Sequence, residues 1–544
     1  MRGKNRFRPF LSRLVALTSV RSETIRCVEF VVAIILSIFA VVLLGVRATH
    51  AGPLWRDECD SVATATLSSL SELLRYFQFD SFPLPFLLTL RGYIAVVGNT
   101  DPSLRLFGAL IGMSLLLVGW WGARRLRLGV PLVFLTLAVL NPSFLVCGTT
   151  VRGYGIGSVM IVFAFAATAN FLAHRTKRNA LLMCIGFLAA VQSLVSNTVL
   201  VFAICLAAVG VCLVRGHRKT AVFVMTALAI AALSFLPYVA TYFKMGWHVL
   251  LQTNVSVVAL WDVFRNSLGA RNSVTAAAWA GLLSIAAISW ILRIAKGAAS
   301  GLAAFALLAA VLSLVGSFVF LKMLSYTPQV WYFLPFICLL AGGIDLAYPT
   351  FASIRVVRLV LCVVAVTGTW WSNWPVLIER QSNVDLIANW LGSRAQTGDL
   401  IVVNPWFFGV SFNRYYHGAA PWVTVPILSD RRIHRYDLMR EKMSEPDPLA
   451  DLRPTIESTL RNGGRVYLVG GVQLVSEGER VLVLPPAPQS QYGWSYLPYV
   501  IAWSQQLAAF LQAHVQTSAE VPQLTDRVNS PENIPLWQVA GWHD

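Results

Sequence analysis

The feature that most constrains this chain is the series of long apolar runs in residues 28–374. A helix needs about 20 consecutive apolar residues to cross the hydrocarbon core of a bilayer. Of the 544 residues, 56% are hydrophobic and only 13% are charged, which is too apolar a mixture for a soluble globular protein. The sequence therefore predicts a polytopic α-helical membrane protein.

The apolar runs predict eleven transmembrane helices, beginning with a span at Val28–Val46. This first span is too long and too uninterrupted to be the apolar core of a removable signal peptide. The other ten spans are predicted at Ser103–Gly122, Val130–Val146, Tyr154–Ala173, Ala180–Ser196, Val199–Val214, Ala221–Tyr242, Thr275–Leu292, Gly301–Phe320, Trp331–Tyr348 and Val356–Trp374.

Basic residues predict the orientation, because Lys and Arg are enriched in cytoplasmic loops. Five basic clusters fall on alternate loops: Arg124/Arg125/Arg127, Arg175/Lys177/Arg178, Arg215/Arg218/Lys219, Arg293/Lys296 and Arg355/Arg358. With eleven spans, all five share the cytoplasmic side with residues 1–27, a basic segment predicted as an interfacial amphipathic helix or a mobile tail. Residues 375–544 are then extracytoplasmic.

The net charge of +17 raises the question of nucleic-acid binding. Residues 375–544 hold 13 of the 43 Lys and Arg and 16 of the 26 Asp and Glu, a balance of −3. The first 374 residues therefore hold 30 cations and 10 acids, a balance of +20. The basic excess belongs to the membrane part, where cytoplasmic loops account for it, and no nucleic-acid partner is predicted.

One apolar segment, Leu84–Gly98, is too short for a span and carries Arg91 in its middle. Counting it as a span would also place the cluster at Arg124 outside, against the charge bias. We therefore predict a helix at the outer membrane face, like Ser61–Phe77 before it, within one long outer loop at Ala48–Asp101.

Residues 375–544 predict a small extracytoplasmic α/β domain, because strand-like and helix-like segments alternate there. The predicted strands are Gly398–Asn404, Gly463–Gly471 and Arg480–Pro486, and the predicted helices are Ser382–Arg394, Leu449–Leu460 and Tyr499–His514. This segment contains no Gly-rich phosphate loop, nucleophile elbow or His/Cys metal spacing. Its aromatic cluster Trp406–His417 is interpreted as core packing, with contact to a sugar or lipid acceptor as the alternative.

The stretch LWRDECDS (Leu54–Ser61) places Asp57, Glu58 and Asp60 on the outer loop. One interpretation is a solvated start to the helix expected near Ser61, because acids favour helix N-termini. The other is a carboxylate base, since a carboxylate among cations suits reaction of a hydroxyl or amine with a phosphate-activated group. Candidate basic partners on the outer side are Arg56, Arg91, Arg105, Arg152, Lys244, Arg265, Arg271 and Lys322.

Four stretches resemble, in their order and sidedness, motifs of the GT-C membrane glycosyltransferases, in particular the protein O-mannosyltransferases and lipid A aminoarabinose transferases. They are LWRDEC (Leu54–Cys59), FDSFPLPFLL (Phe79–Leu88), DPSLRLFGAL (Asp101–Leu110) and TVRGYGIG (Thr150–Gly157). The resemblance in topology covers residues 28–374, and the motifs cover fewer than forty residues. It implies a catalytic membrane domain over residues 28–374 with an appended extracytoplasmic domain.

The resemblance implies inverting transfer of a sugar from a polyprenyl-phosphate donor to an extracytoplasmic glycan, lipid or protein. It implies that Asp57 is the general base or orients the acceptor, with Glu58 and Asp80 beside it. The residues that it implies for the lipid-linked phosphate are Arg152, Tyr154, Arg105 and Lys322. Multi-pass insertion in a bacterial inner (plasma) membrane is expected, with membrane lipids as further partners.

The chain also departs from the family at one motif. Where relatives carry His-Pro-Pro or Glu-Lys-Pro, this chain reads Asp80-Ser81-Phe82-Pro83. Neither a metal requirement nor a phosphate-binding Lys can be carried over, so the cofactor stays open. A divalent cation, if one is used, is expected at Asp57 and Glu58.

Two other function classes are weighed against the enzyme. Ion-coupled transporters usually carry ionisable residues at mid-membrane depth, whereas Glu29, Arg105 and Asp345 lie near the ends of predicted spans. This argues against coupled transport but leaves a lipid-linked-sugar flippase as the main alternative. A non-catalytic scaffold is the third reading, favoured only if the outer acids are dispensable.

Overall fold

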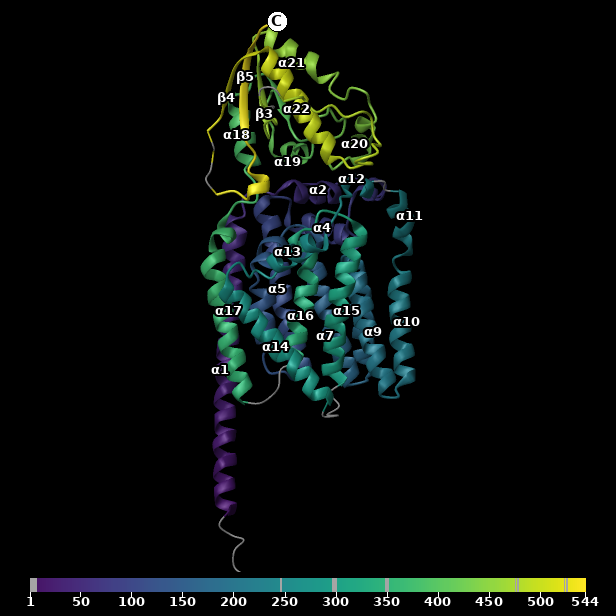
Figure 1. The fold of residues 1–544 in the computed structure, drawn as a ribbon, viewed down its shortest axis with the longest axis vertical. Helices are drawn as coiled ribbons and strands as arrows, with labels where there is room; N and C mark the ends of the chain where they lie inside the picture. Colours follow the sequence, from purple (N-terminus) through teal and green to yellow (C-terminus); the bar gives the residue numbers. More distant parts are fainter. Residues whose placement is uncertain are drawn as a thin grey trace, which may run out of the picture.

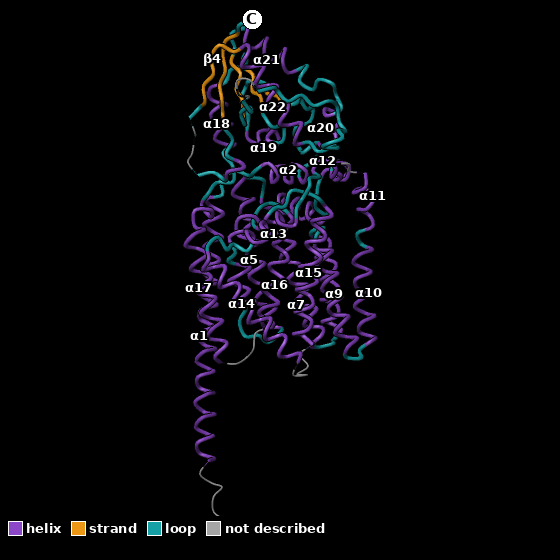
Figure 2. Tube along the Cα trace, in the orientation of Figure 1, coloured by secondary structure: helices purple, strands orange, loops and turns teal. Residues whose placement is uncertain are grey.

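The computed structural model describes residues 7–244, 247–295, 301–347, 352–474, 476, 479–522, 524 and 527–544. A bundle of long helices forms one part of the molecule, and a smaller domain built around a β-sheet sits on one end of it (Figures 1 and 2). We call this the domain end of the bundle. The short helix α2 (Arg56–Ala65) lies between the two parts.

Nine of the described helices are long and apolar enough to cross a membrane. They are α1 (Phe7–His50), α5 (Asp101–Arg125), α7 (Gly153–Ala173), α9 (Asn197–Val214), α10 (Arg218–Leu233) with the start of α11 (Leu236–Lys244), α14 (Ser273–Ala295), α15 (Gly301–Leu324), η4 (Val330–Phe333) with α16 (Leu334–Ala347), and α17 (Ala352–Ile378). The prediction of a polytopic helical membrane protein is confirmed. Two of the eleven predicted spans, however, are not among these nine helices.

The predicted span Ala180–Ser196 is α8 (Lys177–Ser193), a helix of 17 residues that packs beside α7. At 1.5 Å per residue it is about 25 Å long, shorter than a full span.

The predicted span Val130–Val146 is not a regular helix. It consists of α6 (Leu132–Phe134) and two single π-helical turns, η2 (Leu135–Val139) and η3 (Phe144–Gly148). Irregular backbone at membrane depth is tolerated only where protein surrounds it, and nearly all of this segment is buried. Asp345 of α16 accepts hydrogen bonds from the N–H groups of Val133 (3.1 Å) and Phe134 (2.8 Å), which would otherwise lack partners.

The N-terminal segment also differs from its prediction. Residues 7–27 continue the first predicted span as one helix, α1, which extends beyond the bundle away from the domain end (Figure 1). Neither a separate interfacial helix nor a tail is present from residue 7 onward, and residues 1–6 lie outside the described part.

The helices that follow the first span lie at the domain end. The helix predicted at Ser61–Phe77 begins earlier, as α2, and is interrupted before α3 (Leu70–Tyr76) and the short η1 (Phe77–Phe79). The helix predicted at Leu84–Gly98 is α4 (Leu84–Val97). Three further short helices, α11, α12 (His248–Leu251) and α13 (Val257–Ser267), join α10 to α14.

The C-terminal region contains a five-stranded mixed sheet of order β2-β1-β3-β5-β4. The strands are β1 (Leu400–Val403), β2 (Trp422–Thr424), β3 (Arg465–Val469), β4 (Val515–Glu520) and β5 (Leu536–Trp542). β1 pairs in parallel with β2 and β3, while β5 runs antiparallel to β3 and β4. The predicted strand at Arg480–Pro486 is absent: these described residues join no strand of the sheet, and Leu482 instead bonds the side chains of Gln505 and Gln506 on α22.

Helices cover both faces of this sheet, which is why β1 is buried along its whole length. On one face, α20 (Tyr436–Met443), α21 (Leu452–Arg461) and α22 (Leu497–His514) enclose one apolar cluster. On the other face, α18 (Val384–Arg394) and α19 (Phe408–Tyr415) enclose a second cluster that includes Phe408 and Phe412. The aromatic segment Trp406–His417 therefore serves mainly as core.

Polar contacts attach the C-terminal region to the bundle. The Tyr415 hydroxyl donates a hydrogen bond to Asp101 at the start of α5 (2.8 Å) and accepts one from the N–H of Leu54 (2.7 Å). Arg414 forms an ion pair with Asp101 (3.0 Å). On α2, Arg56 forms an ion pair with the buried Glu532 (2.6 Å). These contacts place α2 between the sheet domain and the bundle, so both parts border any site near its acids.

Candidate active site

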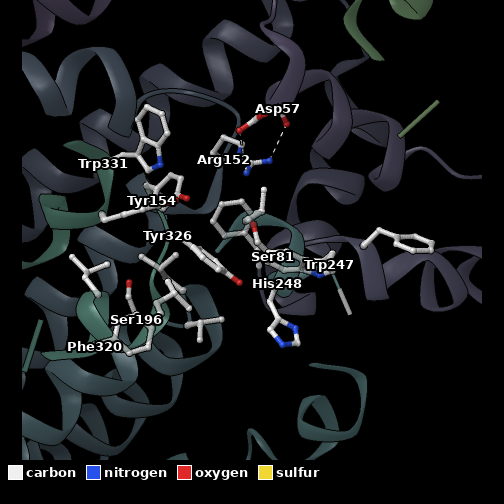
Figure 3. A pocket seen from close by; sticks show the side chains of 18 of the residues that line it. Asp57, Ser81, Arg152, Tyr154, Ser196, Trp247, His248, Phe320, Tyr326 and Trp331 are labelled. Atoms are coloured by element: carbon white, nitrogen blue, oxygen red, sulfur yellow. Dashed lines mark hydrogen bonds and ion pairs between the residues drawn. The ribbon is translucent and has the colours of Figure 1, made fainter. Parts of the chain in front are cut away.

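A cavity of 590 Å³ opens beside α2 at the domain end of the bundle (Figure 3). One end is polar, where Asp57 and Arg152 lie side by side in contact with each other. Most of the other lining residues are apolar or aromatic, including Leu194, Phe235, Val239, Phe320, Leu321 and Met323, with Ser196, His248 and Gln252 among the polar ones. The cavity thus combines a charged end with an apolar channel between membrane helices.

Asp57 stands in the first turn of α2 and lines the polar end. Its carboxylate lies 3.6 Å from Nη2 of Arg152 and 3.7 Å from Nε of Arg56, and its side chain is 26% exposed. Burial would raise the pKa of Asp57, but Arg152 and Arg56 lower it below its ordinary value. The carboxylate is therefore ionised at neutral pH and accessible from the cavity.

Arg152 is the residue immediately before α7, and the packing around it fixes its guanidinium. Nη1 donates to the backbone carbonyl of Asp57 (3.0 Å) and to the hydroxyl of Ser61 (3.2 Å). The guanidinium carbon lies 4.6 Å from the centre of the Phe82 ring. Nε is buried without a hydrogen-bond partner among the described residues. The resulting cation is oriented toward the cavity and retains unused donor capacity, which suits an anionic ligand.

Glu58, the neighbour of Asp57, does not line the cavity. It is fully buried and accepts hydrogen bonds from Nη1 of Arg105 (2.8 Å) and from the N–H groups of Val151 (2.8 Å) and Trp55 (3.2 Å). The geometry makes Glu58 a clamp that joins α2, α5 and the segment before Arg152.

Asp60 is a third acid of α2 and lines the cavity, where the C-terminal region contacts it. Its carboxylate accepts a hydrogen bond from the N–H of His434 at 2.7 Å. Burial raises the pKa of Asp60 to about 7 and lowers the pKa of His434 to about 4. At neutral pH, His434 is therefore uncharged and Asp60 is near its midpoint.

Asp80 lies behind the cavity wall, between the lining residues Phe79 and Ser81. It is buried, and one carboxylate oxygen accepts from the N–H of Phe82 (2.8 Å) while the other has no partner among the described residues. Burial raises the pKa of Asp80 to about 6. Asp80 shapes the turn that positions Phe82 under Arg152.

Tyr154 lies two residues beyond Arg152 and belongs to an aromatic wall of the cavity. Its ring centre lies 5.2 Å from that of Phe82, 6.1 Å from that of Trp331 and 6.0 Å from that of Tyr332. The structure thus brings Asp57, Arg152 and Tyr154 to one cavity, and the roles that the resemblance implies for them stay predictions.

The other candidate cations have different partners. Arg105 binds Glu58 and the backbone carbonyls of Gly52 and Pro53, and Lys322 donates to the carbonyl of Val255; neither lines the cavity. Arg91 donates to the carbonyl of Ala65, the last residue of α2, and to that of Leu67 just beyond it. Arg265 is exposed and pairs with Asp262, Arg271 is exposed, and the side chain of Lys244 lies outside the described part.

Sequence reasoning missed the lining residues that come from distant segments. His434 and Tyr436 come from the C-terminal region, while Trp247 and His248 come from the connection into α12. No local pattern marks these positions, because they reach the cavity only through the docking of the sheet domain and of short interfacial helices.

The residues of the acidic motif do not fit a metal held jointly by Asp57 and Glu58. Both oxygens of Glu58 accept hydrogen bonds from Arg105, and one also accepts from the N–H of Val151. A cation at Glu58 would have to displace a buried guanidinium of like charge. Within the described ranges, no group of three or more His, Cys, Asp and Glu side chains is placed to hold a metal ion.

The fold is similar to solved membrane enzymes. A crystal structure of ArnT from Cupriavidus metallidurans bound to undecaprenyl phosphate matches with a TM-score of 0.51 at 13% identity, over 80% of this chain and 92% of that chain. The apo state of that protein matches with a TM-score of 0.49 at 14% identity and the same coverage. Arabinofuranosyltransferase AftD from Mycobacteria matches with a TM-score of 0.40 at 13% identity, over 94% of this chain and 42% of that chain.

No protein-family model and no curated protein sequence matches the chain. At such low sequence identity, the structural similarity shows the fold and not the activity. The chain is a polytopic helical membrane protein with a GT-C-like fold and a mixed α/β sheet region at its C-terminus.

Proposed function

We propose that this protein is an inverting glycosyltransferase that moves a sugar from a polyprenyl-phosphate donor to an extracytoplasmic acceptor. The observation that carries the proposal is the pairing of Asp57 with Arg152 at the polar end of an apolar cavity. A carboxylate base and a phosphate-binding cation are the two groups that such a transfer requires from the protein.

The shape of the cavity supports a lipid-linked donor. The apolar channel past Phe320 and Leu321 suits a polyprenyl chain, and the guanidinium of Arg152 suits the phosphate that joins this chain to the sugar. An arginine holds a phosphate through two parallel N–H bonds, which fixes its orientation as well as its charge. Undecaprenyl phosphate bound to the structurally similar ArnT is consistent with a ligand of this class.

In the proposed reaction, an acceptor hydroxyl attacks the anomeric carbon of the sugar while the bond to the phosphate oxygen breaks. Asp57 accepts the hydroxyl proton, and polyprenyl phosphate leaves with the bonding electrons and is stabilised by Arg152. The sugar carbon inverts, because the nucleophile and the leaving group occupy opposite faces of the ring.

Because Asp57 contacts Arg152, binding of the donor phosphate at Arg152 changes the pKa of Asp57. In the free protein, Arg152 and Arg56 hold the pKa of Asp57 below its usual range, which makes it a weak base. A donor phosphate that binds Arg152 offsets this positive charge and adds a negative charge nearby. Both effects raise the proton affinity of Asp57, so the base becomes stronger when the donor is in place.

The proposed orientation places the domain end, with Asp57 and the sheet region, on the extracytoplasmic side of a bacterial inner membrane. Nucleotide-sugars are cytoplasmic, so a lipid carrier is the natural donor on that side. α5 and α7 begin at the domain end, where Asp101 contacts Arg414 and Arg152 contacts Asp57. Their basic far ends therefore lie on the opposite side, as the charge bias of cytoplasmic loops requires.

The test is sugar transfer from a synthetic undecaprenyl-phosphate-sugar in membranes that contain equal amounts of each variant. Asp57→Asn keeps the shape of the side chain but loses the proton acceptor, so transfer should fall by about 10²–10⁴-fold. Asp262→Asn on α13, where the acid is exposed, is the matched control and should keep its rate.

Wild-type transfer by Asp57→Asn would remove the enzyme proposal's main support. Movement of intact lipid-linked sugar across vesicles that contain the protein, without transfer, would instead favour the flippase.

A further inference from the structure

A second cavity, of 580 Å³, lies beside the first, where the sheet domain meets the bundle. Its walls come from α20 on one side and from η1 and α12 on the other, and Figure 1 shows α20 facing α12 across this junction. Phe79, Trp247 and Tyr436 line both cavities. The second cavity is therefore the first one's immediate neighbour, and its volume lies in the range of about 300–1,000 Å³ typical of ligand sites.

The walls of the second cavity differ in chemistry from those of the first. Apart from the three shared aromatic residues and Leu250, the lining side chains are polar: Gln78, Asp437, Arg440, Glu441, Ser444 and Glu445. A lipid chain needs an apolar channel, which these walls do not supply.

The charges of these walls do not favour an anion. Three acids face one cation, Arg440, and its guanidinium lies 4.2 Å from the centre of the Trp494 ring. Asp437 pairs with Arg435 (2.6 Å) and Glu445 with Lys442 (2.9 Å), which reduces the acidic excess without creating a cationic site. A phosphorylated or uronic-acid ligand would meet carboxylates rather than cations.

The boundary between the cavities is aromatic and has an unused hydrogen-bond donor. The rings of Trp247 and Tyr436 stack with centres 5.9 Å apart at 28°. Trp247 is 8% exposed, and its indole N–H has no hydrogen-bond partner among the described residues. A buried polar group without a partner is costly in a native structure, so a ligand oxygen at this boundary would relieve the cost.

We propose that the second cavity binds the acceptor, and that the acceptor is an uncharged glycan. Aromatic faces pack against the apolar faces of sugar rings, while carboxylates and amides bind the hydroxyl groups. A glycan seated between α20 and α12 extends past Trp247 and Tyr436 into the first cavity, which brings a terminal hydroxyl toward Asp57. The assignment as acceptor rests on the proposed transferase, whereas the binding of a neutral glycan does not.

The test measures binding to the full chain in nanodiscs by saturation-transfer NMR. The probes are neutral hexasaccharides of glucose, mannose, galactose and arabinose, with hexagalacturonate as the anionic counterpart and a Ser/Thr-rich peptide as the protein counterpart. At least one neutral hexasaccharide should bind at least about tenfold more tightly than hexagalacturonate or the peptide. Failure of all neutral probes, or tighter binding of either counterpart, overturns the proposal.

A substitution locates the binding. Ser444→Trp fills the cavity from the exposed end of α20, so it should weaken binding of the neutral glycan at least about tenfold. Ser458→Trp, at an exposed position of α21 and away from both cavities, is the matched control and should leave binding unchanged. Equal binding by these two variants would overturn the assignment to this cavity.

A donor measurement separates this inference from the proposed function. Undecaprenyl phosphate should raise the unfolding temperature of Ser444→Trp as much as that of the wild type, because the first cavity is unchanged. Sugar binding at the second cavity without any stabilisation by undecaprenyl phosphate would contradict the transferase and leave the glycan site standing. Stabilisation by the lipid without any glycan binding would contradict the glycan site and leave the transferase standing.

Discussion

The carboxylate of Glu58 accepts a hydrogen bond from the N–H of Val151, the residue just before Arg152, at 2.8 Å. The same carboxylate binds the guanidinium of Arg105, and both side chains are buried. One acid of the motif thus fixes the position of the cation that faces its neighbour Asp57. The two adjacent acids have different tasks: Glu58 positions the site, and Asp57 faces the cavity.

Glu58→Gln should destabilise the protein strongly. Removing one charge of a buried ion pair typically costs about 3–5 kcal/mol, because the remaining charge is left uncompensated. The unfolding temperature should fall, and the affinity for undecaprenyl phosphate should fall with it because Arg152 loses its anchor. Asp57→Asn should instead keep the unfolding temperature and the affinity for undecaprenyl phosphate, while its transfer rate falls.

Glu457→Gln is the control for that experiment. It breaks the exposed Glu457–Arg461 pair on α21, and exposed pairs contribute only about 0–1 kcal/mol. If the two Glu→Gln variants unfold at the same temperature, Glu58 does not hold α2, α5 and the segment before Arg152 together.

Arg152→Lys should weaken the binding of undecaprenyl phosphate although the charge is kept. A lysine ammonium cannot form the two parallel N–H bonds of a guanidinium, and it loses the planar contact with Phe82. The measurement is the lipid concentration that gives half-maximal stabilisation against heat. Arg265→Lys, at an exposed position, should leave it unchanged; unchanged binding in Arg152→Lys would exclude this residue from the phosphate site.

The stability of the protein should decrease as the pH rises from about 4 to about 7, in part because of Asp60. Burial raises the pKa of Asp60 from 3.8 to about 7, so in this window the folded protein binds more protons there than the unfolded chain. Stability then declines with rising pH and levels off above the folded pKa. Asp60→Asn should flatten this part of the curve of unfolding temperature against pH. A variant curve parallel to the wild-type curve would contradict the buried, proton-binding state.

Cysteine labelling should place the domain end outside the cytoplasm. In a Cys27→Ser background, Ser518→Cys on the exposed strand β4 should react with an impermeant maleimide in intact cells. Arg125→Cys at the far end of α5 should react only after the membrane is opened. The reverse pattern would show that the orientation predicted from the basic clusters is wrong.

Much of the fold was predictable because apolar runs and basic loops are local signals. They indicated the long helices, and the shortness of Leu84–Gly98 identified α4. The buried strands β1 and β3 also showed their apolar character in the sequence. β4 did not, because VQTSAE is almost wholly exposed and lacks an apolar face.

Other features depend on contacts between distant residues. The run Val130–Val146 has the composition of a span, and its composition does not reveal that α6 begins by donating N–H groups to the distant Asp345. The acidic motif also does not reveal which acid faces a cavity. Asp57 and Glu58 are adjacent in α2, and only their distant partners separate them: Glu58 meets Arg105 and the N–H of Val151, whereas Asp57 meets Arg152 at the cavity.

The docking of the sheet domain on α2 also sets the order of events during synthesis. Asp57 is made early, whereas His434 and Glu532, which contact α2 at Asp60 and Arg56, emerge from the ribosome several hundred residues later. Until then, the nascent chain has an uncovered α2 and an incomplete cavity wall. The cavity wall beside Asp60 is therefore complete only after the sheet domain has folded onto α2, so the site is assembled last.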